Sequence, residues 1–276
     1  MPELPEVEVI ARGLHATLAG RAIARVVHAD PTRLSDPADA LTPRITGRTI
    51  KRVHRRAKVL LLDLDDGATL VFHLKMTGRV VHSPRRAANG YDRLLLLLDD
   101  NSQLSFSDMR RFGYVRAFGP GELARWDFLA RVGPEPLETD SLVLAKRLSG
   151  RRGAVKGLLL DQSVVAGVGN IYADEALFRA GIHPQARADG IGTDQARTLF
   201  AELQSVLRQA IDENGSSIRD YVNARGDAGA FQNSFNVYGR KGEPCRTCST
   251  LLEAVRVAGR TSTFCPRCQP GNGGRR

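Results

Sequence analysis

Two different spacings of apolar residues divide the chain into a β-rich part and a helical part. Near the start, apolar side chains recur every three or four positions, at Val7, Ile10, Leu14 and Leu18. This spacing predicts an amphipathic helix over residues 6–19 that ends at Gly20. Between residues 21 and 119 the apolar residues form short runs separated by turn sequences. Many short strands joined by turns predict an antiparallel sandwich or barrel.

A helical pattern returns after residues 133–140, a segment rich in proline, glycine and acidic residues. Thr193 is predicted to cap a long helix, because the apolar residues that follow it keep a 3.6-residue spacing until Gly215 stops the pattern. The fold class is therefore α+β. The predicted boundaries are a β-sandwich domain at 1–133, a helical domain at 134–236, a cysteine-containing module at 237–270 and a disordered tail at 271–276.

All four cysteines lie in the last part of the chain and form the pattern C-x2-C-x16-C-x2-C. They are Cys245, Cys248, Cys265 and Cys268. This spacing is typical of a zinc site in which two short turns each supply two thiolates. Four thiolates complete a tetrahedral shell and leave no position for water. We therefore predict one Zn²⁺ with a structural role, a feature that says little about function by itself.

The charge of the chain narrows the class of partner. The sequence has 40 Lys and Arg against 30 Asp and Glu, a net charge of +10. Such an excess favours a polyanion, because cationic surfaces gain affinity by releasing counterions from phosphates; a protein that is merely basic stays an alternative. No run approaches the roughly 18 apolar residues of a membrane span, and the N-terminus does not resemble a signal peptide. We expect a cytoplasmic protein without disulfides.

Two further segments suggest chemistry but leave it open. The chain begins MPELPEVEVI, with prolines at 2 and 5 and glutamates at 3, 6 and 8, which indicates either a helix start or a reactive site. Residues 167–184 read GVGNIYADEALFRAGIHP, where Asn170 can cap a helix. The N–H groups at such a helix start can bind a phosphate. A capped core helix explains the same residues equally well.

Three motifs together resemble one family. They are PELPEVE at the start, GVGNIYADEALFRAGIHP in the middle and YGRKGEPC with the cysteines that follow. Their sequence and order resemble bacterial formamidopyrimidine-DNA glycosylases, from residue 2 to about residue 269. The resemblance implies a monomeric bifunctional glycosylase and AP lyase of base excision repair that acts on double-stranded DNA. It also implies a helix-two-turn-helix domain at 134–236 and a zinc finger at 237–270.

The resemblance assigns the chemistry to the N-terminus. In this family Met1 is removed, and the secondary amine of Pro2 attacks the sugar C1′ to give an iminium. An α-amino group has a pKa of about 7.7–8.0 against about 10.4 for lysine, so more of it is unprotonated at neutral pH. Glu3 is expected to assist ring opening as a general acid/base. Glu6 would orient the first helical turn and its waters, although both carboxylates also suit a helix start. Lys58 is expected to contact the damaged nucleotide.

The resemblance also predicts the residues that contact DNA. Met76, Arg110 and Phe112 match loops that fill the gap left when the damaged base is flipped out, and Arg110 would hydrogen-bond the widowed cytosine. Residues 225–235 correspond to a loop that covers the flipped base. The positions that match phosphate contacts, or lie beside them, are Lys156, Asn170, Tyr172 and Arg260.

Three residues depart from the family pattern. Ala57 replaces a glycine ahead of Lys58, Met109 replaces a proline, and Ala230 replaces a tyrosine. If the usual glycine serves a positive φ, Ala57 strains that turn. Met109 would make its loop less rigid, and Ala230 bears on which lesion is preferred.

Other functions are weighed against these residues. An endonuclease VIII-type enzyme would prefer oxidised pyrimidines, but Leu4 and the loop around Arg110 and Phe112 favour oxidised purines such as 8-oxoguanine and formamidopyrimidines. A non-catalytic zinc-finger DNA-binding protein would be expected to lose Pro2, Glu3 or Lys58, and all three are present. An RNA-binding zinc protein would need stacking aromatics, which form only 6% of the chain.

Overall fold

The computed structural model describes residues 1–30, 36–217, 221, 223–224 and 227–271. These residues form two compact units. The first comprises residues 1–130 and 213–232, and the second comprises residues 131–212 and the chain from 233 onward. The chain therefore crosses between the units more than once.

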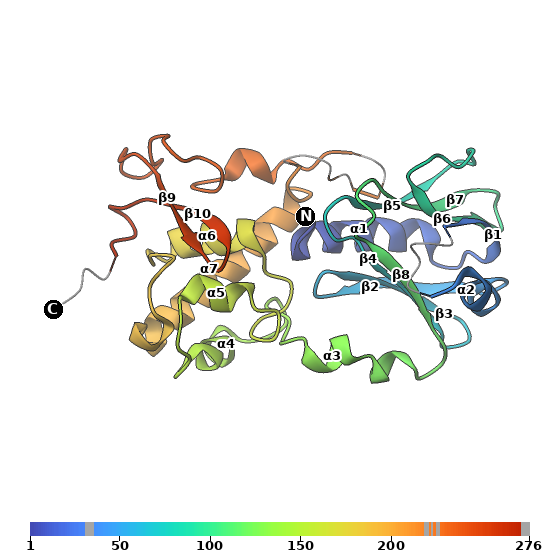
Figure 1. Cartoon of the computed structure of the whole chain (residues 1–276), viewed down its shortest axis with the longest axis horizontal. Coiled ribbons are helices and arrows are strands. Elements are labelled where there is room, and N and C mark those ends of the chain that lie inside the picture. The colour runs from blue at the N-terminus through green and yellow to red at the C-terminus, as the bar shows by residue number, and fades with distance from the viewer. Residues whose placement is uncertain (31–35, 218–220, 222, 225–226, 272–276) are drawn as a thin grey trace. The chain divides into compact units, whose positions relative to one another are not determined.

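The first unit is a sandwich of two four-stranded antiparallel sheets, as the sequence predicts (Figure 1). One sheet has the order β1-β6-β7-β5 and the other β2-β3-β4-β8. The strands are β1 (Ile23–Ala29), β2 (Ile50–Arg56), β3 (Val59–Leu64), β4 (Thr69–His73), β5 (Gly78–Ser83), β6 (Asp92–Leu98), β7 (Gln103–Asp108) and β8 (Tyr114–Phe118).

Helix α1 (Leu4–Leu18) supplies part of the core of the sandwich. Its four periodic apolar residues are at most 1% exposed and join the same buried cluster as side chains of both sheets. Burying one such side chain contributes about 1.5–3 kcal/mol. The helix starts two residues before the predicted start because Pro5 occupies its first turn. It ends as predicted, with Gly20 at a φ of +85°.

Strand β5 and helix α2 are among the elements of this unit that were not predicted. Strand β5 has the sequence GRVVHS, in which only Gly78 and Val80 are buried, so its apolar signal is short. Helix α2 (Ala38–Ile45) buries only Leu41 and Ile45 and carries a proline at position 43, which obscures the helical pattern.

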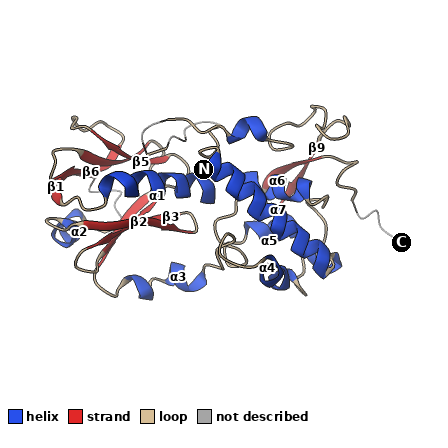
Figure 2. Cartoon of the chain, turned by 180° about the vertical axis from the view of Figure 1, so that it is seen from behind, coloured by secondary structure: helices blue, strands red, loops and turns tan. Residues whose placement is uncertain are grey.

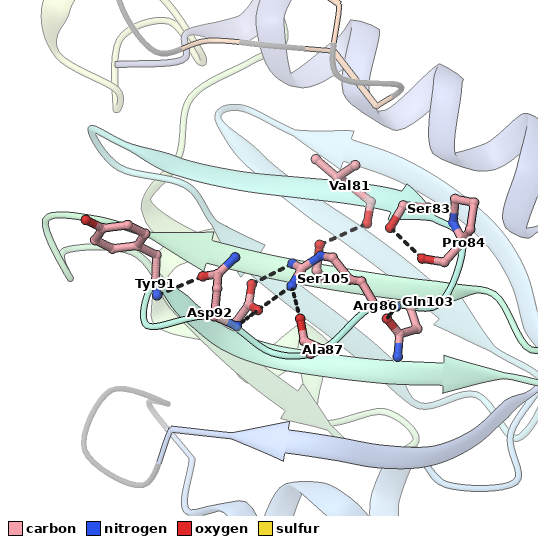
Figure 3. A network of polar contacts seen from close by, with 10 residues as sticks. Val81, Ser83, Pro84, Arg86, Ala87, Tyr91, Asp92, Gln103 and Ser105 are labelled. Carbon is pink, nitrogen blue, oxygen red and sulfur yellow. Dashed lines mark hydrogen bonds and ion pairs between the residues drawn. The ribbon is translucent and has the colours of Figure 1, made fainter.

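The connection between β5 and β6 is held by a buried carboxylate (Figure 3). Asp92 accepts two hydrogen bonds from the guanidinium of Arg86, at 2.7 and 2.8 Å, and one from the backbone N–H of Asn89 at 2.8 Å. Burial alone would raise the pKa of Asp92, but these hydrogen bonds outweigh it and lower the pKa below its usual value. Asp92 therefore fixes the start of β6. The next residue, Arg93, donates two hydrogen bonds to the carbonyl of Asp108 at the end of β7.

The second unit contains four principal helices and a β-hairpin (Figure 2). The helices are α4 (Ser141–Leu148), α5 (Val155–Leu160), α6 (Asn170–Arg179) and α7 (Thr193–Asp212), and the hairpin strands are β9 (Glu253–Val257) and β10 (Arg260–Phe264). Helix α7 packs on α4 and α6 through the predicted face, which includes Leu199, Leu203, Val206 and Ala210. The short elements of the chain are η1 (Leu123–Arg125), α3 (Asp127–Arg131), η2 (Ala188–Gly190) and η3 (Phe231–Ser234).

Among the described residues, no helix combines the length and the apolar character that a membrane crossing requires. Residues 272–276 of the predicted disordered tail lie outside the described residues.

Candidate functional site

The first turn of α1 buries the N-terminal acidic residues. Pro2 is buried just ahead of the helix, and Glu3 and Glu6 are 3% and 2% exposed. Glu3 is the N-cap and forms a capping box with Glu6, whose Oε2 accepts the backbone N–H of Glu3 at 2.8 Å. The other oxygen of Glu6 accepts the N–H of Ser216 at 2.9 Å. Glu6 therefore joins the first turn to the segment that follows α7.

That segment also supports the described end of the predicted capping loop. The N–H of Phe231 donates to the carbonyl of Gly215 at 3.0 Å, and the N–H of Gly229 donates to Ser217 Oγ at 2.8 Å. Gly215 has a φ of +78°, and a Cβ there would lie 3.1 Å from Cγ of Glu6. Glycine is therefore required at this point. Residues 225 and 226 of the predicted loop lie outside the described residues.

Lys58 lies in the two-residue turn between β2 and β3 and is 8% exposed. Ala57 in this turn has a φ of +53°, so the predicted strain is present. The turn is tied to α1 through the strand that precedes it, because Oε2 of Glu8 lies 2.7 Å from Nε of Arg55. Arg55 is almost fully buried at this contact. This ion pair links the turn that carries Lys58 to the helix that follows Pro2.

His73, at the end of β4, belongs to the same region and was not predicted. It pairs with Val59, the residue after Lys58. Burial, and then the positive charges of Lys75 and Lys58, lower the pKa of His73 to about 3. Its Nδ1 accepts the N–H of Lys75 at 3.2 Å, which leaves the proton of the neutral ring on Nε2 as a donor. A histidine two residues before Lys75, at the end of the apolar run TLVFHLKM, is the signal that could have identified it.

The predicted wedge residues lie on exposed loops of the first unit. Met76 is 37% exposed and Phe112 is 55% exposed, values that are high for large apolar side chains. The guanidinium of Arg110 lies 4.9 Å from the centre of the Phe112 ring. Arg110 and Phe112 therefore form one exposed group, whereas most apolar side chains of this unit are in its core.

Asp108, at the end of β7, holds both of these loops together and was missed by the sequence reasoning. Its Oδ1 accepts hydrogen bonds from Thr77 Oγ1 at 2.5 Å and from the N–H of Arg110 at 3.2 Å. Its Oδ2 accepts the N–H of Gly113 at 2.7 Å, and its carbonyl accepts two hydrogen bonds from Arg93. An acidic residue at the junction of a strand and an Arg-rich loop was the available signal.

Two of the four predicted DNA-contact residues of the second unit, Asn170 and Arg260, are not enclosed by the fold. Arg260 is exposed at the start of β10, and Nδ2 of Asn170 donates to the carbonyl of the next residue, Thr261, at 3.1 Å. Asn170 is the first residue of α6, whereas Gly169 is the N-cap. The capping role predicted for Asn170 was therefore wrong, and its side chain contacts β10 instead.

Lys156 and Tyr172, in contrast, are both 0% exposed. Nζ of Lys156 lies 2.7 Å from Oδ1 of Asp174. Burial raises the pKa of Asp174 to about 6, although its contacts with Lys156 act to lower it. Direct phosphate binding by either side chain is thus not supported by their placement.

The four cysteines come together as a metal site. Their Sγ atoms lie within 4.8 Å of one another, with Cys245 to Cys268 at 3.9 Å and Cys248 to Cys265 at 3.4 Å. Ligands about 2.3 Å from a tetrahedral zinc ion are roughly 3.8 Å apart, so the cluster fits Zn²⁺. The four residues bind one structural Zn²⁺, as the spacing predicted.

Comparisons with known proteins agree with this arrangement. Residues 1–115 match the formamidopyrimidine-DNA glycosylase N-terminal domain, residues 132–222 match the H2TH domain of the same enzyme, and residues 242–271 match a zinc finger found in FPG and IleRS. The formamidopyrimidine-DNA glycosylase of Chloroflexus aggregans is 45% identical over 98% of this chain and 98% of its own length.

Two solved structures extend the comparison to the fold. A Lactococcus lactis FPG mutant, G226P, in complex with Fapy-dG-containing DNA aligns with a TM-score of 0.91 and 33% identity, covering 98% of this chain and 100% of that one. The MutM (FPG) protein of Thermus thermophilus aligns with a TM-score of 0.85 and 40% identity, covering 97% and 98%. The chain therefore belongs to the formamidopyrimidine-DNA glycosylase family.

Proposed function

We propose that this chain, a DNA glycosylase of base excision repair, removes oxidised purines such as 8-oxoguanine and formamidopyrimidines and then nicks the strand at the abasic site. The observation that carries the proposal is the N-terminus. Pro2 directly precedes a buried capping box of Glu3 and Glu6, in the same unit as the exposed side chains of Met76, Arg110 and Phe112. That combination pairs a reactive amine with side chains suited to entering a duplex.

The reaction starts once Met1 has been removed. The secondary amine of Pro2 forms a bond to C1′ of the damaged nucleoside while the N-glycosidic bond breaks, and the base leaves with a proton. Glu3 donates a proton to the ring oxygen of the sugar as the ring opens, which gives an iminium. The iminium accepts the electron pair when a C2′ proton is removed and the 3′ phosphate leaves. A second elimination releases the 5′ phosphate, and water then frees Pro2.

The other residues position the DNA. Lys58, whose charge acts on the neutral His73, would contact the phosphate or sugar of the damaged nucleotide. Glu6 holds the first turn of α1 and the segment at Ser216, in support of Pro2 and Glu3. Arg110 would pair with the base left opposite the gap, while Met76 and Phe112 fill the gap. Asn170 and Arg260 would bind a phosphate beside the zinc hairpin.

The preference for purines is supported by the relatives. The Lactococcus lactis FPG structures contain DNA with Fapy-dG, which is a purine lesion. Leu4 and the exposed loop with Arg110 and Phe112 match the purine-specific pattern. An endonuclease VIII-type activity on oxidised pyrimidines is the second candidate, because Ala230 departs from the pattern of the loop expected to cover the base.

The oligomeric state, the cellular location and the domain boundaries complete the proposal. We infer a monomer that acts in the bacterial cytoplasm on nucleoid DNA. Its domains would be the β-sandwich at 1–133, the helix-two-turn-helix domain with the capping loop at 134–236 and the zinc finger at 237–270. Residues 213–232 belong to the first compact unit, so limited proteolysis around residue 213 would test whether the helix-two-turn-helix domain extends to residue 236.

Strand cleavage on matched duplexes tests the proposed function. Purified protein is incubated with one duplex that carries 8-oxoguanine opposite cytosine and another that carries an oxidised pyrimidine. We expect faster cleavage of the first duplex and products with phosphates at both ends of the gap. Glu3→Gln should lower the rate at least tenfold without weakening binding to an abasic analogue. Faster cleavage of the pyrimidine duplex would replace the substrate assignment, and binding without cleavage would favour a non-catalytic protein.

A further inference from the structure

Lys156 on α5 and Asp174 on α6 form an ion pair inside the second unit. The two side chains are 0% and 1% exposed, and their charged atoms are 2.7 Å apart. Removing two charges from water costs several kcal/mol per ion, and mutual attraction often fails to recover that cost. Such a pair is therefore a poor device for stability alone. The proposed reaction leaves it without a chemical role.

The contacts of the pair lead to the zinc hairpin. Nζ of Lys156 donates to the carbonyl of Thr261 at 3.3 Å, and that carbonyl also accepts Nδ2 of Asn170. Asp174 accepts a hydrogen bond from Ser262 Oγ at 2.5 Å and one from the N–H of Thr263 at 3.2 Å. Three consecutive residues of β10 are thus held by the two helices.

Arg260 is the residue immediately before these three. It is exposed, and it follows a hairpin turn in which Ala258 and Gly259 have φ values of +48° and +72°. The turn approaches α5, because a Cβ added to Gly157 would lie 3.6 Å from Cβ of Ala258. The backbone direction of Arg260 is therefore fixed from its C-terminal side by residues 261–263.

We propose that Lys156 and Asp174 are positioning residues for DNA binding, which hold residues 261–263 so that Arg260 and Asn170 face the same phosphate. This rests on the proposed function, since it assumes that the second unit binds DNA. Lys156 acts through β10, because its enclosed ammonium has no path to a phosphate. A Lys held in this way replaces the direct phosphate contact that the sequence predicted.

The charge of Asp174 makes the proposal easy to distinguish from simple electrostatics. Replacing Asp174 by asparagine removes one negative charge from a protein that binds a polyanion. Electrostatics alone would strengthen DNA binding. Loss of positioning would weaken it, because asparagine cannot pair with Lys156 or accept from Ser262 and Thr263 as a carboxylate does. The two mechanisms therefore predict opposite signs.

The experiment measures the affinity of the full-length, zinc-loaded protein for a duplex that contains a tetrahydrofuran abasic analogue, over a range of salt concentrations. We expect Asp174→Asn to weaken binding about tenfold. The slope of log affinity against log salt should fall by about 0.9, the amount expected for one lost phosphate contact. Arg260→Ala should produce the same two changes. The double variant should bind no more weakly than Arg260→Ala, since both changes remove the same contact.

Two further variants keep the test decisive. Glu253→Gln, on the exposed face of β9, removes the same charge without touching residues 261–263 and should bind equally or more tightly. Ser262→Ala removes a single anchor without a change of charge, and it should weaken binding about threefold. It decides the question if Asp174→Asn does not fold or loses zinc. The zinc content of every variant is measured.

Each result has a definite meaning. Binding of Asp174→Asn at or above the wild-type affinity would overturn the positioning role. Losses that simply add in the double variant would also overturn it, because the pair would then act elsewhere than through Arg260. If the wild-type protein itself does not prefer the abasic duplex over an undamaged one, the proposed function fails instead.

Discussion

Glu6 offers a quantitative test of how the N-terminus is built. Its two carboxylate oxygens accept separate backbone N–H groups, from Glu3 at 2.8 Å and from Ser216 at 2.9 Å. Both contacts are buried, so water cannot replace a lost partner. In Glu6→Gln one oxygen remains as an acceptor, while the new NH₂ group faces an N–H donor. One contact is therefore lost and one repulsive contact is introduced.

The size of the effect follows from the strength of these contacts. A hydrogen bond to a charged group contributes about 1.5–3 kcal/mol, and a buried donor without a partner costs about 1–3 kcal/mol. These terms describe the same lost contact, so they are not summed. We expect Glu6→Gln to lower the free energy of unfolding of the first unit by about 2–3 kcal/mol. The rate of base excision should also fall at least tenfold, because the first turn carries Pro2 and Glu3.

Urea unfolding followed by tryptophan fluorescence measures this effect. The chain has one tryptophan, Trp126, which lies in the first unit and packs on Phe118. Fluorescence therefore reports on the unit that contains Glu6. Glu202→Gln, on α7 in the second unit, is the control and should leave this transition unchanged. A destabilisation below about 0.5 kcal/mol would show that Glu6 does not bridge α1 and Ser216 in solution, and the reasoning would be refuted.

Three other predictions concern the remaining parts of the molecule. Asp108→Asn should reduce the ratio of 8-oxoguanine excision opposite cytosine to excision opposite adenine by about tenfold, because Asp108 holds the loop with Arg110. Single-turnover kinetics measure this ratio, and an unchanged ratio would show that Asp108 has no part in discrimination of the opposite base. Asp92→Asn should cost about 1–2 kcal/mol at pH 7, since Arg86 is about one-third exposed. The folded-state pKa of Asp92 is lowered, so its contribution is present above the usual value of 3.8 and is lost as the pH falls through the folded value. Urea unfolding should therefore show a smaller cost of the substitution at pH 3 than at pH 7, and a constant cost would contradict the ion pair. Removing zinc with a chelator should abolish DNA binding, measured by fluorescence anisotropy, and restored zinc should recover it; binding by the zinc-free protein would separate the cysteine cluster from recognition.

The sequence predicted those features that depend on short-range patterns. The spacing of Val7, Ile10, Leu14 and Leu18 defines one helical face, and the structure buries that face. The two C-x2-C pairs needed no knowledge of the rest of the fold, because each pair already presents two thiolates to one metal. The strain at Ala57 followed from the resemblance, because a glycine is usual at this position and the turn gives Ala57 a positive φ.

Features that depend on distant contacts could not be predicted in the same way. The partner of Glu6 is Ser216, which is 210 residues away. The sequence predicted a phosphate contact for Lys156, because its partner Asp174 and its acceptor Thr261 are brought to it only by the fold. Asp108 similarly acquires its role when β5 pairs with β7 and brings Thr77 beside it.

The central claim is that Pro2 is the nucleophile. We would incubate the protein, shown by intact mass to lack Met1, with a duplex that carries 8-oxoguanine opposite cytosine, and add borohydride to reduce any iminium. The account predicts a covalent protein–DNA adduct whose linkage maps to Pro2 by peptide mass. An adduct at a lysine such as Lys58, or no adduct from zinc-loaded protein that binds the duplex, would contradict it.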